Sequence, residues 1–178
     1  MDRPSSPDPV ADPEGYRRHL LGLLGDDDPV EAQSATAAEL RALADEAGTA
    51  RAVRPMPEEW SVLECIGHIF DAEVVMSGRY RWVIAHDEPP LIGYDQDLWV
   101  ERLRHGVDDP DELLGGFDGL RRANVALWNR TLPEDRSRVG AHAERGPESY
   151  DTMFRMLAGH DRFHVSQARR ALAAVTTT

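Results

Sequence analysis

The chain has 178 residues and a formal net charge of −12 at pH 7, from 32 acidic and 20 basic side chains. This length fits one domain, and the acidic charge would repel a phosphate backbone, so we expect no nucleic-acid partner. Cys65 is the single cysteine, which excludes an intramolecular disulfide and favours a reducing, cytoplasmic location.

The N-terminal segment, residues 1–13, is acidic and rich in proline. It has neither the basic start nor the apolar run of a signal peptide. No stretch elsewhere approaches the roughly 18 consecutive apolar residues of a membrane-spanning helix. We therefore expect a disordered lead-in over residues 1–13, one folded domain over residues 14–178, and no membrane partner.

The first predicted long helix follows a short helical turn. Thr36 and Glu39 have the spacing of a capping box, in which each side chain satisfies a free backbone N–H group at the helix start. Apolar side chains then recur at helical spacing, and Gly48 is a typical helix stop. The pattern predicts a helix between Thr36 and Gly48.

The second predicted helix has the clearest start in the chain. Ser61 can cap it, Glu64 stands at the third helical position, and Trp60 precedes the cap, where it can pack against Cys65. One face of this helix combines apolar residues with a histidine; it consists of Cys65, His68, Ile69, Ala72, Val75 and Met76. Two prolines after residue 88 require the helix to end before them.

A long aromatic and acidic connection, residues 91–108, predicts at most a short helix. The third long helix begins after Asp109, which can cap it, with Pro110 at the first helical position. Pro133 ends this helix. We interpret residues 139–149 as a loop that contains at most a brief strand.

The fourth long helix begins after Ser149, and its apolar face includes His160 and His164. Four long helices without a convincing pair of strands predict an all-α fold, a four-helix bundle. Bundles bring facing apolar stripes together and commonly build metal sites between them.

Three histidines are the strongest functional signal. His160 and His164 stand four residues apart, so both imidazoles lie over one patch of helix surface. With His68 they would make three inward histidines, each of which must be hydrogen-bonded separately or bind a metal. We favour one divalent metal. Three neutral imidazoles leave an open coordination position; Zn is favoured, and Ni, Fe or Cu also suit nitrogen ligands.

Two stretches, WSVLECIGHIFDAE and ESYDTMFRMLAGHDRFHVSQARR, resemble the signature stretches of the DinB-like superfamily of metal-binding four-helix bundles. PPLIGYDQDLWVERL also resembles the family's connection between its second and third helices, so the resemblance covers residues 16–173. It implies a metal triad of His68, His160 and His164. Many relatives carry a further histidine where this chain has Phe163, which implies altered pocket chemistry with the metal retained.

Other side chains are candidates for the surroundings of the metal. Asp71, Glu73 and Asp161 can orient ligand imidazoles or belong to solvated helix faces, and Gln167 can bridge to the last ligand. We interpret Cys65 as a buried hydrophobe, with a fourth ligand as the alternative.

Polar and aromatic residues outside the triad are harder to assign. A substrate carboxylate could bind one of several arginines; these are Arg79, Arg81, Arg162, Arg169 and Arg170. Aromatic side chains could line a pocket mouth; the candidates are Trp82, Tyr94, Trp99 and Trp128. Of these, we place Trp128 in the core. His19, His86 and His105 are expected at the surface. His142 lies in the loop before the fourth helix, where we expect it to be exposed, with an approach to the metal as the alternative.

The resemblance implies a thiol-dependent enzyme, because characterised relatives are S-transferases and isomerases that use mycothiol, bacillithiol or glutathione. We therefore expect a divalent-metal-dependent enzyme whose small-molecule partners are a thiol and an electrophile. Hydrolysis by a metal-activated water is the chemical alternative, although no glutamate is placed as in zinc hydrolases. A non-catalytic metal-binding or stress-response protein and a bundle without metal stay open. The resemblance also allows a homodimer.

Overall fold

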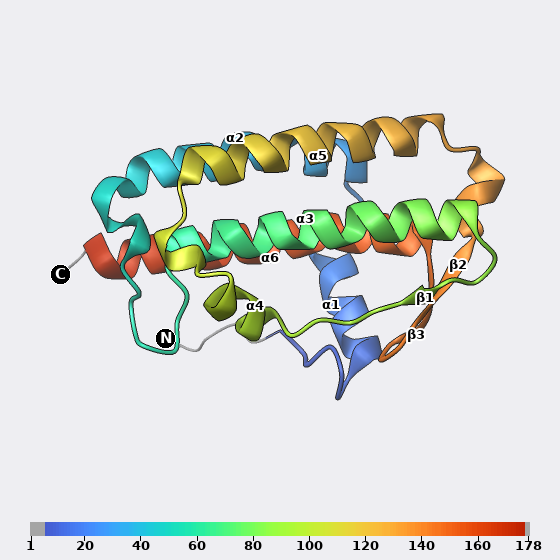
Figure 1. Cartoon of the computed structure of the whole chain (residues 1–178), viewed down its shortest axis with the longest axis horizontal. Coiled ribbons are helices and arrows are strands. Elements are labelled where there is room, and N and C mark those ends of the chain that lie inside the picture. The colour runs from blue at the N-terminus through green and yellow to red at the C-terminus, as the bar shows by residue number, and fades with distance from the viewer. Residues whose placement is uncertain (1–5, 177–178) are drawn as a thin grey trace.

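The computed structural model describes residues 6–176, and its frame is a bundle of four long helices (Figure 1). These are α2 (Pro29–Ala47), α3 (Val62–Ala85), α5 (Pro110–Arg130) and α6 (Tyr150–Thr176). The shorter helices are α1 (Pro13–Leu24), α4 (Gln96–Arg102), η1 (Gly48–Ala52), η2 (His105–Val107) and η3 (Pro133–Ser137). In Figure 1, α2 and α5 form one side of the bundle, and α3 and α6 form the other. The predicted four-helix bundle is confirmed. No helix within residues 6–176 combines the length and apolarity that crossing a membrane requires.

Three of the predicted helix starts are confirmed in atomic detail. The Ser61 hydroxyl accepts the backbone N–H of Glu64, and the Glu64 carboxylate accepts the backbone N–H of Ser61, so the capping box of α3 is complete. Asp109 caps α5 ahead of Pro110. The Ser149 hydroxyl accepts the backbone N–H of Thr152 at the start of α6. These caps are contacts over two or three residues, which explains why the sequence shows them.

The predicted start of the first long helix is wrong. Helix α2 begins at Pro29, and the Asp28 carboxylate accepts the backbone N–H groups of Val30 and Glu31. Thr36 therefore lies inside the helix, where it is buried and donates a hydrogen bond to Asp161 on α6. The aspartate–proline pair is a stronger start signal than Thr36, because proline has no N–H group to satisfy and its φ angle suits the first helical turn.

Helix α1 was not anticipated from the sequence. Asp12 caps it, and Leu20 and Leu24 are buried where it crosses α6. The crossing is so close that a Cβ atom on Gly159 of α6 would lie 1.9 Å from the carbonyl oxygen of Leu20. Part of the expected disordered lead-in is described: residues 6–12 contain a turn in which the Asp8 carboxylate accepts two backbone N–H groups. Residues 1–5 lie outside the described residues.

A small three-stranded sheet corrects the expectation of no strand pair. Its strands are β1 (Pro90–Leu91), β2 (Val139–His142) and β3 (Gly146–Ser149), in the order β1-β2-β3. β2 and β3 form an antiparallel hairpin, and β1 pairs with β2 in parallel. Strands of two to four residues are too short for an alternating pattern to appear in the sequence.

The bundle interior has two apolar clusters with a polar layer between them. One cluster surrounds Leu40 and Ile66, and the other surrounds Tyr80 and Phe154. Along α3 and α6 the boundary between the clusters falls near residues 68–73 and 160–164. The three candidate histidines lie at this boundary.

Candidate metal centre

The structure brings His68, His160 and His164 together inside the bundle. One ligating atom from each histidine lies within 4.8 Å of those of the other two, and all three side chains are buried. The Nε2 atoms of His68 and His160 are 3.0 Å apart. The ring of His164 lies 4.4 Å, centroid to centroid, from each of the other two rings. The expected grouping across two helices is therefore present, and metal ligation itself stays a prediction.

The protonation chemistry of the cluster suits a cation. Burial, followed by the charge of neighbouring histidines, holds the pKa of His68 and of His164 well below the usual range, so both imidazoles are neutral at pH 7. Neutral imidazole is the form that ligates a metal. The Nδ1 atoms of His68 and His160 are buried without a hydrogen-bond partner. The three convergent rings fit one divalent metal better than they fit separate hydrogen bonding.

Two side chains orient the rings. Gln167, one turn after His164, lies with its Oε1 atom 2.9 Å from His164 Nδ1. This places the proton on Nδ1 and leaves the Nε2 lone pair for the cluster. Trp60 was assigned only to the helix start, but its ring also stacks on His164 and packs against His68. Phe163 packs edge-on against His164.

Two of the acidic residues considered as partners of the ligand imidazoles, Glu73 and Asp161, bind other side chains instead. The Oδ1 atom of Asp161 is 3.9 Å from His160 Nδ1, which is beyond hydrogen-bond distance. The Oδ2 atom of Asp161 accepts a hydrogen bond from Arg121 at 2.6 Å. Glu73 accepts hydrogen bonds from Arg121 and from Asn124. Glu73, Asp161 and Arg121 are all at most 2% exposed, so they form a buried network beside the histidine cluster. The alternative that these acids belong to solvated helix faces is therefore wrong for Glu73 and Asp161.

Asp71 contacts His105, for which the expectation of a surface position is wrong. His105 of η2 is buried, and its ring nitrogens lie 2.7 Å from Asp71 and 2.5 Å from Asp108. Burial works against protonation, but the hydrogen bonds to Asp71 and Asp108 outweigh it and raise the pKa of His105. The contact between His105 and Asp71 therefore fastens η2 to α3.

His142 was also expected at the surface, and this is wrong too. It is 3% exposed on β2 and lies 3.2 Å from Arg79, outside the metal cluster. Burial, then the charges of Arg145 and Arg79, lowers its pKa to about 4. His86 is exposed as expected, and His19 is half-buried against Phe163.

Cys65 is a buried hydrophobe. Its side chain is fully enclosed in the apolar cluster around Leu40, and among the described residues the metal-competent group contains histidines alone. Burial raises the pKa of its thiol far above the usual range. The structure thus favours the interpretation of Cys65 as core over a fourth ligand.

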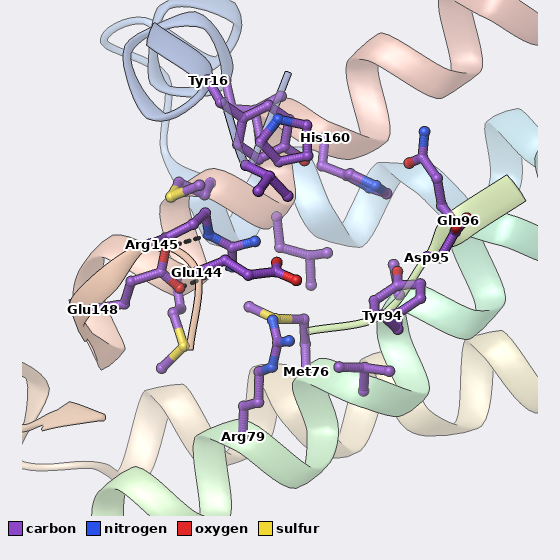
Figure 2. A pocket seen from close by; sticks show the side chains of 18 of the residues that line it. Tyr16, Met76, Arg79, Tyr94, Asp95, Gln96, Glu144, Arg145, Glu148 and His160 are labelled. Atoms are coloured by element: carbon purple, nitrogen blue, oxygen red, sulfur yellow. Dashed lines mark hydrogen bonds and ion pairs between the residues drawn. The ribbon is translucent and has the colours of Figure 1, made fainter. Parts of the chain in front are cut away.

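A cavity of about 420 Å³ reaches the cluster from one side, within the range of small-molecule sites (Figure 2). His68 and His160 lie on its wall, which is otherwise apolar near them; the apolar residues are Leu20, Ala72, Val75, Met76, Met153, Met156 and Leu157. Arg79 is the one of the five candidate arginines that lines the cavity. Of the aromatic candidates, Tyr94 lines it and Trp99 packs on Tyr94, whereas Trp82 is exposed and Trp128 lies in the core.

The fold and the cluster define a helical-bundle protein with a buried three-histidine centre. The family profile of the DinB superfamily matches residues 30–168, so the chain belongs to the DinB superfamily, as its sequence stretches indicated.

Known relatives agree with this assignment. Two proteins of Oceanobacillus iheyensis, both carrying the provisional name metal-dependent hydrolase, are 23% identical over 115 residues and 25% identical over 108 residues. The matches cover 64% and 60% of this chain, and 65% and 62% of the relatives' own lengths. The structure of YfiT from Bacillus subtilis matches 99% of this chain and 93% of its own, with a TM-score of 0.75 at 14% identity, which shows a shared fold.

Proposed function

We propose that this protein is a divalent-metal-dependent enzyme that transfers a low-molecular-weight thiol to a small electrophile in the cavity. The observation that carries the proposal is the buried cluster of His68, His160 and His164, open to a cavity through His68 and His160. A divalent metal there would supply a Lewis acid that lowers the pKa of a thiol or a water reaching it. Zn is favoured, and Ni or Fe also suit the ligands.

The protein's own side chains would prepare the site. Gln167 sets the tautomer of His164, and Trp60, which is itself buried, packs against the rings of His68 and His164. The apolar residues of the cavity wall surround His68 and His160, so these two histidines are the polar groups at this end of the cavity. Accessibility favours an enzyme over a closed structural metal site.

Hydrolysis is the second candidate, favoured by the names of the Oceanobacillus iheyensis relatives and by the description of YfiT as a metal-dependent hydrolase. The arrangement of acids supports thiol transfer instead. A carboxylate often takes the proton from the attacking water in a metal-dependent hydrolase, but Asp161 pairs with Arg121 and Glu148 with Arg145. A thiol has an ordinary pKa near 8.5, far below that of water, so it ionises with less help from a base.

The experiment begins with elemental mass spectrometry on protein purified without a histidine tag. We expect about one metal per chain, lost in His68→Ala. The metal-loaded protein is then tested with glutathione, bacillithiol and mycothiol against a fluorogenic thiol acceptor, and separately against an ester. Thiol-dependent turnover that His68→Ala abolishes supports transfer, and turnover of the ester without thiol supports hydrolysis. A metal-free protein after reconstitution with Zn, Ni and Fe would contradict both.

A further inference from the structure

A buried arginine in the cavity has no acidic partner. Arg79 on α3 is 4% exposed and lines the same cavity as His68 and His160. Within the part of the chain that the structure describes, no carboxylate lies within ion-pair distance of its guanidinium. Arg121, buried to a similar degree, contacts two carboxylates. Because burying an unpaired cation is costly, the environment of Arg79 favours an anion beyond those that the described residues supply.

The hydrogen bonds of Arg79 leave donors free. Its Nη2 atom donates to the carbonyl oxygen of Ile92. Its Nη1 atom contacts only the Met76 sulfur, at 3.8 Å, and its buried Nε atom has no partner. Burial, then the charge of Arg145, lowers the pKa of Arg79, although the charge of Glu148 acts in the opposite direction.

The contact between Arg79 and His142 places two donors face to face. The Nδ1 atom of His142 accepts the backbone N–H groups of Glu144 and Arg145, at 3.2 Å and 3.3 Å. A neutral imidazole that accepts at Nδ1 carries its proton on Nε2. That Nε2–H group lies 3.2 Å from Nη2 of Arg79, so neither group satisfies the other. An anionic oxygen beside them would accept from both.

The acids of the cavity do not neutralise Arg79. Glu148 is buried and paired with Arg145 at 2.7 Å, and Figure 2 draws this ion pair on the wall of the same cavity as Arg79. Asp95 uses its carboxylate to cap α4. Asp8, Asp97 and Glu144 also line the cavity, and all three are exposed. Because Glu148, the buried acid of the lining, pairs with Arg145, the charge of Arg79 is left unpaired among the described residues.

We propose that Arg79 binds the carboxylate of a small molecule in this cavity, with the Nε2–H group of His142 as a second donor, while the other end of the molecule reaches the histidine cluster. This deepens the proposed function and rests on it for the role of the cavity as the substrate site.

The spacing along α3 defines the class of ligand. Arg79 follows His68 by eleven residues, so the two project from nearly the same face, roughly 16 Å apart along the helix axis. Ala72, Val75 and Met76 line the cavity between them. The ligand is a carboxylic acid with an apolar body of several carbon atoms.

Equilibrium binding of a homologous series tests the proposal. The straight-chain carboxylates from butanoate to decanoate are each compared with the corresponding neutral amide by calorimetry or ligand-observed NMR. We expect the carboxylate to bind at least ~10-fold tighter than its amide for some member of the series, because hydrogen bonds to a charged donor favour the anion. Arg79→Gln should bring the two affinities within about 2-fold of each other, and Arg79→Lys should retain part of the difference.

Arg81→Gln is the matched control. Arg81 lies two residues further along α3 and binds Ser77 and Asn124, away from the cavity. This variant should keep the carboxylate preference. Equal binding of carboxylates and amides to the wild-type protein across the whole series would overturn the proposal, whether or not Arg79→Gln folds.

The His68→Ala variant separates this site from the metal. A carboxylate anchored by a metal would lose its preference in His68→Ala and keep it in Arg79→Gln, and that pattern would overturn the proposal. We expect the reverse. Because the assay needs neither metal nor turnover, a protein that binds carboxylates through Arg79 but holds no metal would contradict only the proposed function.

Discussion

Removal of Arg121 is the sharpest test of how the interior beside the histidine cluster is stabilised. Arg121 donates to Glu73 at 2.9 Å and to Asp161 at 2.6 Å, and both carboxylates are at most 2% exposed. Arg121→Met keeps much of the apolar stem and removes the charge, so two buried carboxylates lose their cation. Breaking a buried ion pair in this way costs roughly 3–5 kcal/mol.

The remaining contacts place the expected cost in the lower part of that range. Glu73 keeps the amide of Asn124 at 2.7 Å, and Asp161 keeps the hydroxyl of Thr36 at 3.0 Å. We therefore expect a loss of about 3–4 kcal/mol in the free energy of unfolding. For a chain of this size each kcal/mol corresponds to about 2–4 °C, so the melting temperature should fall by roughly 6–16 °C. Urea titration and thermal melts followed by circular dichroism measure both quantities.

Arg122→Met provides the matched control on the same helix. Arg122 pairs with Asp118 at the surface, where their side chains are 72% and 41% exposed, so its loss should cost at most about 1 kcal/mol. If Arg121→Met costs no more than Arg122→Met, the buried network contributes no net stability and the reasoning from burial fails.

A pH series adds an independent check. Burial alone would raise the pKa of Asp161, but the Arg121 cation outweighs it and holds that pKa below the usual value. This contribution to stability is present above the unfolded pKa of about 3.9 and is lost as the pH falls through the folded pKa. The stability difference between wild type and Arg121→Met should therefore shrink below about pH 4. A difference that stays constant with pH would show that Arg121 acts through packing alone.

Three further predictions concern other parts of the molecule. Gly159→Ala should lower the free energy of unfolding by at least about 1–3 kcal/mol, because the new Cβ atom would lie 1.9 Å from the Leu20 carbonyl oxygen. Gly115→Ala is the control, because the space around Gly115 is open. In a thermal melt this second variant should be neutral or stabilising. His105 has a raised pKa, so its contribution to stability is full below pH ~6.5 and is lost as the pH rises through the folded pKa; urea titrations should show His105→Gln approaching wild type at alkaline pH, and a gap that widens there would contradict this sign. Zinc at 100 times its dissociation constant should stabilise the wild type by about 2.7 kcal/mol, whereas His164→Ala, melted with and without the metal, should show little shift.

The sequence by itself determined the features that depend on local spacing. The caps at Ser61, Asp109 and Ser149 act over two or three residues, and the histidine pair on α6 is separated by four, so each is readable without a fold. The third histidine was assignable because a bundle must bury the apolar stripe of α3, and His68 lies in it.

Competing local signals marked the limit of that reading. Thr36 with Glu39 has the spacing of a cap, but Asp28 and Pro29 start the same helix earlier and leave Thr36 to contact Asp161 inside the bundle. Where two start signals lie in one helix, only the packing of the whole helix decides between them.

Only the tertiary structure decided which polar side chains are buried and what they contact. Arg79 and His142 are 63 residues apart in the chain, and Arg121 and Glu73 are 48 apart, so no periodicity relates the members of either pair. A sequence pattern can place a side chain on a helix face, but the charge balance around it is set by other elements. For this reason the sequence named five arginines as candidates for an anion, and the folded chain left one of them buried in the cavity without an acidic partner.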